Sequence, residues 1–412
     1  MARNGFLMAV RGLLPRIGVV VSIGCLVALI GGPALARAST GSVSQSQFND
    51  VACTSAQNCM AVGWYQASGR GSVYFTLAES WNGQAWRIVA IPSPQHRGGG
   101  AQLNAISCVS STDCMAVGQS LIFTSTGNLV PSPLAEVWNG SKWTIVPTPK
   151  LRNSGASLDG IACTSASSCM AVGNKGTPTS PNDLTLAESW NGTSWKLVPT
   201  PPPPTGGTTL LRVSCTSSAS CMAVGYYGFN GSNDSQITLS EQWNGTRWRI
   251  LTTPNPGNSG ALGGVACFSA SACMATGDHF AHSPTRIIVT LSERWDGTKW
   301  QVQPSPNPAG AALAAFGPVS CVSPSACMGV GSATDSTGEE NFTLAESWNG
   351  TSWTILPTPS PGSFIDTLNG VSCTAVTACM AVGAFDGTTD VFTLAERWNG
   401  TSWTMLKTPV HR

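Results

Sequence analysis

The segments VSCVSPSACMGVG (319–331) and LAESWNGTSWTILPTP (344–359) form the unit that decides the fold, because the chain repeats it seven times. Each copy reads [SA]-C-x5-C-M-x-[VT]-G, a variable stretch, L-[AS]-E-x-W-[ND]-G-x-x-W and a Pro-containing link. The first cysteines of successive copies lie 52 to 55 residues apart. Short apolar runs and turn residues at a period of about 50 residues are typical of β-propeller blades. The sequence predicts an all-β, seven-bladed β-propeller with four antiparallel strands per blade.

The repeats also set the expected domain boundaries. We expect a signal peptide at 1–36, a short linker at 37–47 and a single propeller at 48–412. The expected blades are 48–94, 103–149, 158–201, 210–254, 262–306, 316–359 and 368–409.

The N-terminal segment has the features of a secretory leader. Three arginines within the first 16 residues precede the apolar run 17–32, and residues 34–36 give an A-x-A cleavage pattern. The alternative is a retained anchor, since an apolar segment of about 20 residues can span a bilayer. The sequence predicts a secreted protein that inserts into no membrane after cleavage, whereas a retained leader would place it at the cell surface.

The composition excludes one class of partner. Charged residues are 10% of the chain, the formal net charge is +1, and no Lys/Arg cluster lies beyond residue 16. A nucleic-acid-binding protein needs a basic patch or stripe. The sequence therefore predicts no nucleic-acid partner.

Fourteen of the 15 cysteines form C-x5-C pairs, and Cys25 belongs to the leader. Each pair closes the hairpin between the first two strands of its blade, and paired thiols oxidise in an exported chain. No copy supplies the C-x2-C or companion His of a zinc site. The predicted disulfides are Cys53–Cys59, Cys108–Cys114, Cys163–Cys169, Cys215–Cys221, Cys267–Cys273, Cys321–Cys327 and Cys373–Cys379.

Asn-Gly joins the third and fourth strands in six copies, and Asp296-Gly297 does so in the fifth. This pair favours a two-residue type I′ hairpin. In the sixth copy such a hairpin would place Trp348 opposite Thr351 and Glu346 opposite Trp353. Five of the Asn residues also begin N-x-[ST] glycosylation sequons, but turn chemistry explains all seven copies.

Alternation of side chains predicts the packing between blades. Residues two apart share a face of a strand, so the two tryptophans and the glutamate of each copy lie together. We expect the Trp pair to fill the gap between neighbouring blades. We expect the repeated glutamate to accept hydrogen bonds from backbone or indole N–H groups of the adjacent blade.

The C-M-A-V-G and L-A-E-x-W-N-G-x-x-W segments resemble the kelch repeat of galactose-oxidase-type propellers across residues 48–409. Each copy has one Gly where kelch units have two, and Trp where Tyr is usual. The resemblance implies a propeller; galactose-oxidase chemistry would need copper held by Tyr, His and Cys. The chain after the leader has only His96, His279, His282 and His411, and its cysteines are paired. We therefore expect no metal, no cofactor and no catalytic residue.

Function is expected on the connections between strands 2 and 3 and between successive blades, which we call the variable face because their lengths differ between copies. Aromatic residues there suit recognition. The predicted binding residues are Trp64, Tyr65, Arg70, Tyr74, Tyr226, Tyr227 and Asn230. The sequence predicts a monomeric binding or scaffold protein, not an enzyme, for a glycan or protein partner. One alternative function is an extracellular carbohydrate-active enzyme, galactose-oxidase-like or sialidase-like. A second interpretation is that the aromatic residues bind nothing and only extend the second strands.

The ends of the repeat predict how the ring closes. The first copy begins with its own first strand near Phe48, and the last ends with its own fourth strand near residue 406. No strand is left for exchange between the ends. We expect blades 1 and 7 to meet through their faces, with residues 41–47 adding at most a short edge strand.

Overall fold

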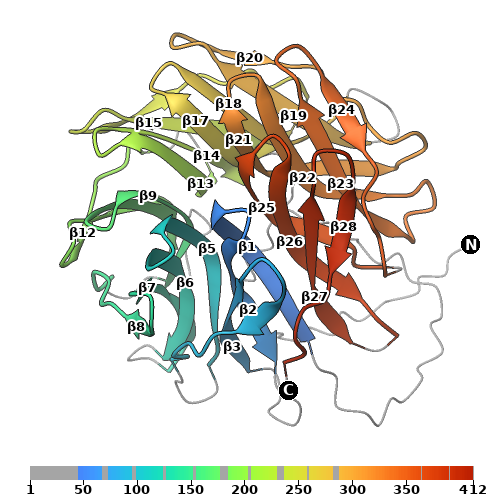
Figure 1. Ribbon diagram of the computed structural model, residues 1–412. Coiled ribbons are helices and arrows are strands. Elements are labelled where there is room, and N and C mark those ends of the chain that lie inside the picture. The colour runs from blue at the N-terminus through green and yellow to red at the C-terminus, as the bar shows by residue number, and fades with distance from the viewer. Residues whose placement is uncertain are drawn as a thin grey trace, which may run out of the picture.

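The computed structural model describes residues 45–66, 73–94, 99–123, 127–151, 155–176, 184–202, 206–229, 236–257, 259–281, 287–362, 364–388 and 390–411. These residues form 28 strands arranged as seven four-stranded antiparallel blades around a central axis (Figure 1). The predicted seven-bladed propeller is confirmed. The predicted leader at 1–36 lies outside the described residues. No helix among the described residues has the length and apolarity that a membrane crossing requires.

The strand bounds follow the repeat. Blade 1 holds β1 (Gln45–Ser55), β2 (Asn58–Gln66), β3 (Tyr74–Trp81) and β4 (Trp86–Ile88), and blade 2 holds β5 (Ala101–Ser110), β6 (Asp113–Phe123), β7 (Leu129–Trp138) and β8 (Trp143–Ile145). Blade 3 holds β9 (Gly155–Ser165), β10 (Ser168–Gly176), β11 (Leu184–Trp190) and β12 (Trp195–Leu197), and blade 4 holds β13 (Gly207–Ser217), β14 (Ser220–Phe229), β15 (Ile237–Trp243) and β16 (Trp248–Leu251). Blade 5 holds β17 (Gly260–Ser269), β18 (Ala272–Phe280), β19 (Ile288–Trp295) and β20 (Trp300–Val302). Blade 6 holds β21 (Leu313–Ser323), β22 (Ala326–Thr334), β23 (Asn341–Trp348) and β24 (Trp353–Leu356), and blade 7 holds β25 (Thr367–Ala375), β26 (Ala378–Asp386), β27 (Val391–Trp398) and β28 (Trp403–Leu406).

The ring closes as the sequence predicts. All four strands of blade 7 come from the C-terminal copy, and β1 pairs with β2 of its own blade. One parallel residue pair, Gln45 with Val391, joins the strands of blades 1 and 7. Blades 5 and 6 share a similar single pair, Ile288 with Leu313, so such a pair is not special to the closure.

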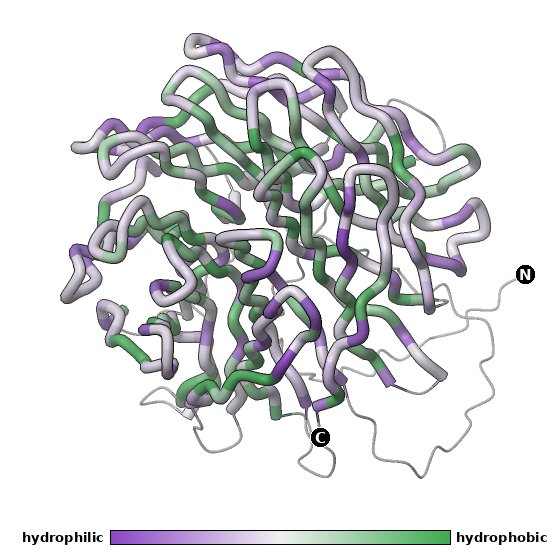
Figure 2. The backbone as a smooth tube through the Cα atoms, viewed as in Figure 1, coloured by the Kyte–Doolittle hydropathy of each residue, from purple (hydrophilic) through white to green (hydrophobic). Residues whose placement is uncertain are grey.

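Seven hydrophobic clusters fill the junctions between neighbouring blades, and each has the same composition. At the junction of blades 7 and 1, Trp81 and Trp86 pack against Met380, Val382 and Ala395. The Trp face of every blade thus meets the Met-x-Val face of the blade before it, with Met-x-Thr in blade 5. Apolar residues follow the strands, and polar residues gather in the outer turns (Figure 2). The predicted role of the Trp pairs is confirmed.

The turn between the third and fourth strands is longer than predicted. In blade 6, Trp348 pairs with Trp353 and Glu346 with Ile355, so four residues form the loop and the predicted register is wrong by two. The cause is the Asn349 side chain, whose Oδ1 accepts the backbone N–H groups of Thr351 and Ser352, both at 2.9 Å. A shift of two leaves each side chain on its face, so the shared face of Trp and Glu survives.

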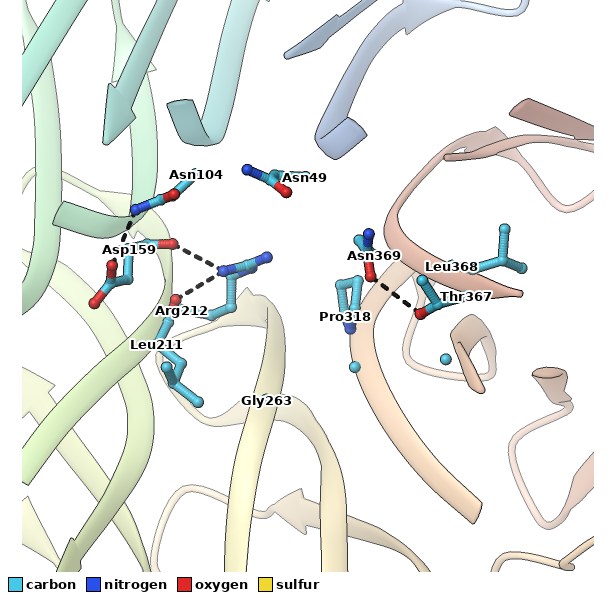
Figure 3. Close-up of a pocket in the computed structure, with 12 residues that line it drawn as sticks. Asn49, Asn104, Asp159, Leu211, Arg212, Gly263, Pro318, Thr367, Leu368 and Asn369 are labelled. Carbon is cyan, nitrogen blue, oxygen red and sulfur yellow. Dashed lines mark hydrogen bonds between the residues drawn. The ribbon is translucent and has the colours of Figure 1, made fainter. Parts of the chain in front are cut away.

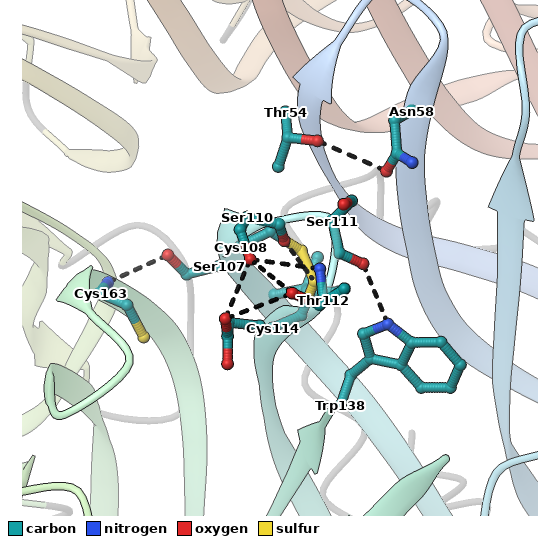
Figure 4. The surroundings of a disulfide bond; sticks show 12 residues. Thr54, Asn58, Ser107, Cys108, Ser110, Ser111, Thr112, Cys114, Trp138 and Cys163 are labelled. Carbon is teal, nitrogen blue, oxygen red and sulfur yellow. Dashed lines mark hydrogen bonds between the residues drawn. A yellow bond between two sulfur atoms is a disulfide. The ribbon is translucent and has the colours of Figure 1, made fainter. Parts of the chain in front are cut away.

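All seven predicted disulfides are present. Each closes a hairpin whose tip accepts a hydrogen bond from the first tryptophan of the same blade. In blade 2, Trp138 Nε1 donates to the Ser111 carbonyl at 3.2 Å, beside the Cys108–Cys114 bond (Figure 4). The 1–2 hairpins and the 3–4 turns thus brace each other, and we call this side the disulfide rim. Seven such bonds indicate an oxidising compartment.

The repeated glutamates are fully buried, but the predicted N–H donors from the neighbouring blade are not their partners. Glu346 accepts the Ser305 hydroxyl at 3.0 Å, and Glu79 Oε1 lies 2.7 Å from Nε2 of His411. Four of the seven have no hydrogen-bond partner for either oxygen among the described residues; these are Glu136, Glu188, Glu293 and Glu396. Burial raises the pKa of each of these four to about 8. The interfaces therefore hold protonated carboxyl groups at neutral pH.

The second tryptophan of each blade has a partner only where the preceding blade carries Ser in L-[AS]-E. Trp300 Nε1 donates to Ser240 Oγ at 3.1 Å, and Trp353 Nε1 donates to Ser292 Oγ at 3.0 Å. Where that residue is Ala, the indole N–H is buried without a partner among the described residues; these tryptophans are Trp86, Trp143, Trp195, Trp248 and Trp403.

Candidate functional site

A β-bulge lies in the innermost strand of every blade, at the residue four positions before the first cysteine. In β1, Phe48 pairs with Gly63 and Asp50 with Val62, which leaves Asn49 outside the ladder. A bulge can re-aim a side chain, and here all seven bulged residues line one cavity at the centre of the ring. They are Asn49, Asn104, Asp159, Leu211, Gly263, Gly317 and Asn369.

The glycine of M-x-[VT]-G is what permits this bulge. A Cβ on Gly63 would lie 1.9 Å from the carbonyl oxygen of Gln47, and the other six copies show the same approach at 1.9 to 2.1 Å. A side chain at this position would therefore push the innermost strand away from the second strand. The recurring glycine is thus a requirement of the channel.

One half of the channel is lined by amides that connect successive blades. Nδ2 of Asn369 donates to the Phe48 carbonyl, and Nδ2 of Asn49 donates to the Leu103 carbonyl, at 2.9 and 2.7 Å. Asn104 continues the series with a 3.0 Å bond to the Leu158 carbonyl. Side-chain hydrogen bonds therefore run around the channel from blade 7 through blades 1 and 2 to blade 3.

This series ends at a buried acid. The Asp159 carboxylate accepts hydrogen bonds from Asn104 Nδ2 at 3.1 Å, from Ser157 Oγ at 3.0 Å and from Asn174 Nδ2 at 3.3 Å. Burial raises the pKa of Asp159 to about 7, although these donors and the charge of Arg212 act in the opposite direction. Asp159 is therefore a group that titrates near neutral pH inside the channel.

Arg212 lies next to this acid and extends into the opening (Figure 3). Its Nη1 donates to the carbonyls of Asp159 and Leu211 at 2.8 and 3.0 Å. The other half of the channel has glycines at the bulge, Gly263 and Gly317, with Pro318 beside them. The guanidinium is thus the channel's cation, and the half of the ring opposite the amides carries no polar side chain at the bulge.

The cavity around these residues has a volume of about 30 Å³. A buried water needs on the order of 10–15 Å³ by the same measure. The channel at this level therefore has room for about two waters or a group of similar size.

The residues predicted from the sequence fall into two sets on different blades. In blade 1, the rings of Trp64 and Tyr74 meet edge to face at 4.8 Å, and Tyr65 stacks on Phe75 at 5.2 Å. Tyr226 and Tyr227 lie on β14 of blade 4, which neighbours blades 3 and 5. The structure does not bring the two sets together. Arg70 and Asn230 lie outside the described residues, and the binding role of this set stays a prediction.

Asp278 and His279 are neighbours on β18, and His282 lies outside the described residues. Burial raises the pKa of Asp278 to about 7, and its Oδ1 has no hydrogen-bond partner among the described residues. His279 Nδ1 lies 3.2 Å from the Phe280 carbonyl. No group of three or more His, Cys, Asp or Glu side chains suited to a metal occurs within the described ranges.

The channel residues were not found from the sequence, although a signal exists. Asn49, Asn104, Asp159 and Asn369 share one offset from the first cysteine of their copies. A polar residue recurring in an otherwise apolar innermost strand points to a polar channel. Arg212 stands one residue later than this offset, so alignment of the copies alone does not place its side chain.

Comparison with known proteins supports the fold. No protein-family model and no curated protein sequence matches the chain. Among solved structures, it is similar to the β-propeller domain of the Trilobed protease from Pyrococcus furiosus, which is described as having an open velcro topology. The TM-score is 0.50 and the sequence identity is 8%, and the alignment covers 90% of this chain and 99% of that one. It is also similar to an acylaminoacyl peptidase from Pyrococcus horikoshii, with a TM-score of 0.51, 9% identity and coverage of 89% and 52%. A third, YCF48 bound to a D1 peptide, has a TM-score of 0.49, 12% identity and coverage of 90% and 99%. At these identities the likeness to the two Pyrococcus proteins shows a β-propeller and no more.

Proposed function

We propose that this chain is an extracellular, kelch-like binding propeller that recognises a protein partner through its variable face. The observation that carries the proposal is the contrast between the two sides of the ring. On the disulfide rim, side chains such as Trp138 and Asn349 are occupied with internal hydrogen bonds. The variable face presents exposed phenyl side chains, whereas the exposed apolar side chains of the disulfide rim among the described residues are the valines Val109 and Val376.

These apolar residues occupy neighbouring blades. Phe123 is 50% exposed and Leu184 is 44% exposed, at the 2–3 connections of blades 2 and 3, and Phe364 is 62% exposed just before blade 7. With Trp64 and Tyr74 of blade 1, they place aromatic and aliphatic groups on blades 7, 1, 2 and 3. Aliphatic and phenyl groups favour a protein partner over a glycan, which is bound by aromatic faces flanked by polar groups.

The test compares the two sides of the ring. A double variant, Phe123→Ser with Phe364→Ser, removes apolar surface from the variable face, and Val376→Ser does so at an exposed tip of the disulfide rim. We expect binding to proteins of the producing cell's surface, measured by quantitative cross-linking, to be lost in the double variant and kept in Val376→Ser. Equal binding by all three proteins would contradict the proposal. If the wild-type protein binds on a glycan array and the double variant does not, the partner is a glycan and not a protein.

A second candidate is an extracellular carbohydrate-active enzyme on the same face, and a pair of acids favours it. Asp366 and Asp386 each place a carboxylate oxygen within 2.4 Å of the position that a Cβ on Gly362 would occupy. Burial, together with the charge of Asp386, raises the pKa of Asp366 to about 6. Adjacent carboxylates with one raised pKa are what general acid–base hydrolysis of glycosides uses. Here Asp366 is buried and accepts the Gly362 N–H. Asp386 accepts the N–H groups of Phe364 and Ile365, so catalysis would require these contacts to open. Release of sugar from a glycan substrate that is abolished by Asp366→Asn would establish this candidate, and no release would remove it.

A further inference from the structure

The guanidinium of Arg212 has unused hydrogen-bonding capacity in the central channel. A guanidinium carries five N–H donors, and the bonds to the carbonyls of Asp159 and Leu211 both come from Nη1. Among the described residues nothing accepts from Nε or Nη2. These atoms are also not enclosed by protein, because they do not occur among the buried polar atoms that lack partners. Three donors of a permanent cation therefore face the channel.

The nearby acids do not occupy those donors. Asp50 and Asp159 act on Arg212 through their charges, yet the ion pair within contact distance among the described residues is the one between His411 and Glu79. The Asp50 oxygens accept the backbone N–H groups of Val51 and Ile106 at 2.9 and 3.1 Å. Both carboxylates are thus held by other donors, and neither forms a fork-to-fork pair with the guanidinium.

The space beside the guanidinium matches a small group. The cavity of about 30 Å³ is bordered by Gly263, Gly317 and Pro318 and by the Asn49 and Asn369 amides; Figure 3 shows Asn369 beside Pro318. A carboxylate or a small oxyanion has oxygens in the planar arrangement that the Nε–Nη2 edge of an arginine binds with two parallel hydrogen bonds.

We propose that the central channel is a binding site for a single oxyanion group, held by the Nε–Nη2 edge of Arg212. The group is either the carboxylate of a larger ligand or a free inorganic oxyanion. The site lies on the axis rather than on the variable face, so it does not depend on the protein partner proposed above.

The acids around the site make its affinity depend on pH. The charged groups that interact electrostatically with Arg212 are Asp50 on β1 and Asp159 on β9, while the channel residues Asn49, Asn104 and Asn369 are neutral. With a pKa of about 7, Asp159 is mostly neutral at pH 6 and mostly ionised at pH 8. An ionised Asp159 repels a bound anion, so binding becomes tighter as the pH falls from 8 to 6.

Calorimetric titration of the full propeller with sodium acetate and with sodium sulfate, at constant ionic strength and at pH 6 and pH 8, tests the site. We expect the wild-type protein to bind at least one of the two, more tightly at pH 6. Arg212→Met should abolish this binding, Arg212→Lys should weaken it at least about tenfold because the planar fork is lost, and Arg249→Met, at an exposed arginine bonded to Gln242, should leave it unchanged.

Asp159→Asn is the second variant, and it tests the anion site if Arg212→Met fails to fold. It should bind the anion more tightly at pH 8 and lose the difference between pH 6 and pH 8. Binding of acetate alone identifies a ligand carboxylate, and binding of sulfate alone identifies an inorganic oxyanion. Binding of neither probe, equal binding by folded Arg212→Met, or an unchanged pH profile in Asp159→Asn would each overturn the proposal.

Discussion

The junction between blades 7 and 1 and the junction between blades 4 and 5 are built from the same repeat positions, yet they differ at the disulfide rim. Near the axis they match, since the Cys53 N–H donates to Ser372 Oγ and the Cys267 N–H to Ser214 Oγ, each at 3.0 Å. At the rim, a cavity of about 240 Å³ separates the hairpins of blades 7 and 1, whereas the same place between blades 4 and 5 has no room for a water. The innermost strands therefore set the same approach of two blades at the axis, and the junctions differ in connectivity, because a chain segment on the variable face links blades 4 and 5 and none links blades 7 and 1. We take the missing link as the hypothesis for the wider rim, and the circular permutant below tests it.

The two junctions also differ in how they satisfy buried polar groups. Glu79, at the junction of blades 7 and 1, has the His411 ring as its partner, whereas Glu293, at the junction of blades 4 and 5, has none among the described residues. The indoles show the reverse, because Trp300 has Ser240 as an acceptor and Trp86 faces Ala395. Within the part of the chain that the structure describes, the junction of blades 4 and 5 therefore has an unpaired glutamate carboxyl group, and the junction of blades 7 and 1 has an unpaired indole N–H group.

The largest expected effect comes from a circular permutant, in which the missing chain link lies between blades 4 and 5 instead of between blades 7 and 1. Gln45 pairs with Gln66, and the neighbouring Tyr65 ring lies 5.1 Å from His411, so a short linker can join residues 411 and 45. A circular permutant with this linker and with new ends in the 252–259 link should close the cavity between blades 7 and 1 and open one between blades 4 and 5. Amide hydrogen exchange measures the change: protection should rise in the hairpin at 53–59 and fall in the hairpin at 267–273. Unchanged protection at both hairpins would show that connectivity does not set the gap.

The second prediction concerns pH and Glu293. Burial raises the pKa of Glu293 to about 8 from 4.5, so the folded state binds a proton that the unfolded state releases. Its contribution is fully present below pH 4.5 and is lost as the pH rises towards 8, a loss on the order of a few kcal/mol. Glu293→Gln should match wild type at pH 5 and exceed it in unfolding free energy at pH 9. Urea unfolding at the two pH values measures the difference in unfolding free energy between the variant and wild type. The same difference at pH 5 and pH 9 would contradict the raised pKa of Glu293.

The third prediction concerns the histidine at the closing junction. His411→Ala leaves the buried Glu79 carboxyl without its 2.7 Å partner, at a cost of about 1–3 kcal/mol. His411→Gln can donate a hydrogen bond and should recover part of that loss, which urea unfolding of both variants at pH 7 would measure. If the alanine variant is as stable as wild type, the contact does not hold blades 7 and 1 together.

The smallest expected effects are a matched pair of changes at the indoles. Ser240→Ala removes the acceptor of Trp300 and should cost about 1–3 kcal/mol, whereas Ala395→Ser supplies an acceptor to Trp86 and should gain about 0.5–1.5 kcal/mol. Thermal unfolding of both single variants measures the two signs. A loss in both would show that the space near Trp86 does not accept a hydroxyl.

The features that the sequence predicts correctly are local or repeated. The spacing of the cysteines predicts the blade count and the disulfide pairs, and the two-residue period of a strand predicts that Trp348, Trp353 and Glu346 share a face. The blade count follows from the number of copies, and the disulfide pairs and the shared face follow from positions within one copy of the repeat. None of these needs the position of any other blade.

The features that it predicts wrongly or misses depend on contacts between strands. The loop after Trp348 is longer because the Asn349 side chain bonds the backbone, a competition that the Asn-Gly pair alone does not show. The bulge at Asn49 arises from the close approach of Gly63 to the neighbouring strand, and it turns a strand residue toward the axis. The direction of Arg212 depends on the same bulge in blade 4, so no spacing rule places it in the channel.

The uniform polarity of the blade junctions has a consequence for assembly. Every blade presents a Met-x-Val face (Met-x-Thr in blade 5) to one neighbour and a Trp face to the other, so the contact is head-to-tail at all seven junctions. A heterologous contact of this kind closes only at the right number of copies and otherwise propagates. A fragment cut at two links would carry one unmatched face of each kind, and two such fragments could satisfy each other. Loss of one blade by recombination would therefore turn a closed ring into a unit that polymerises, while a separated pair of complementary fragments would reassociate without any designed interface.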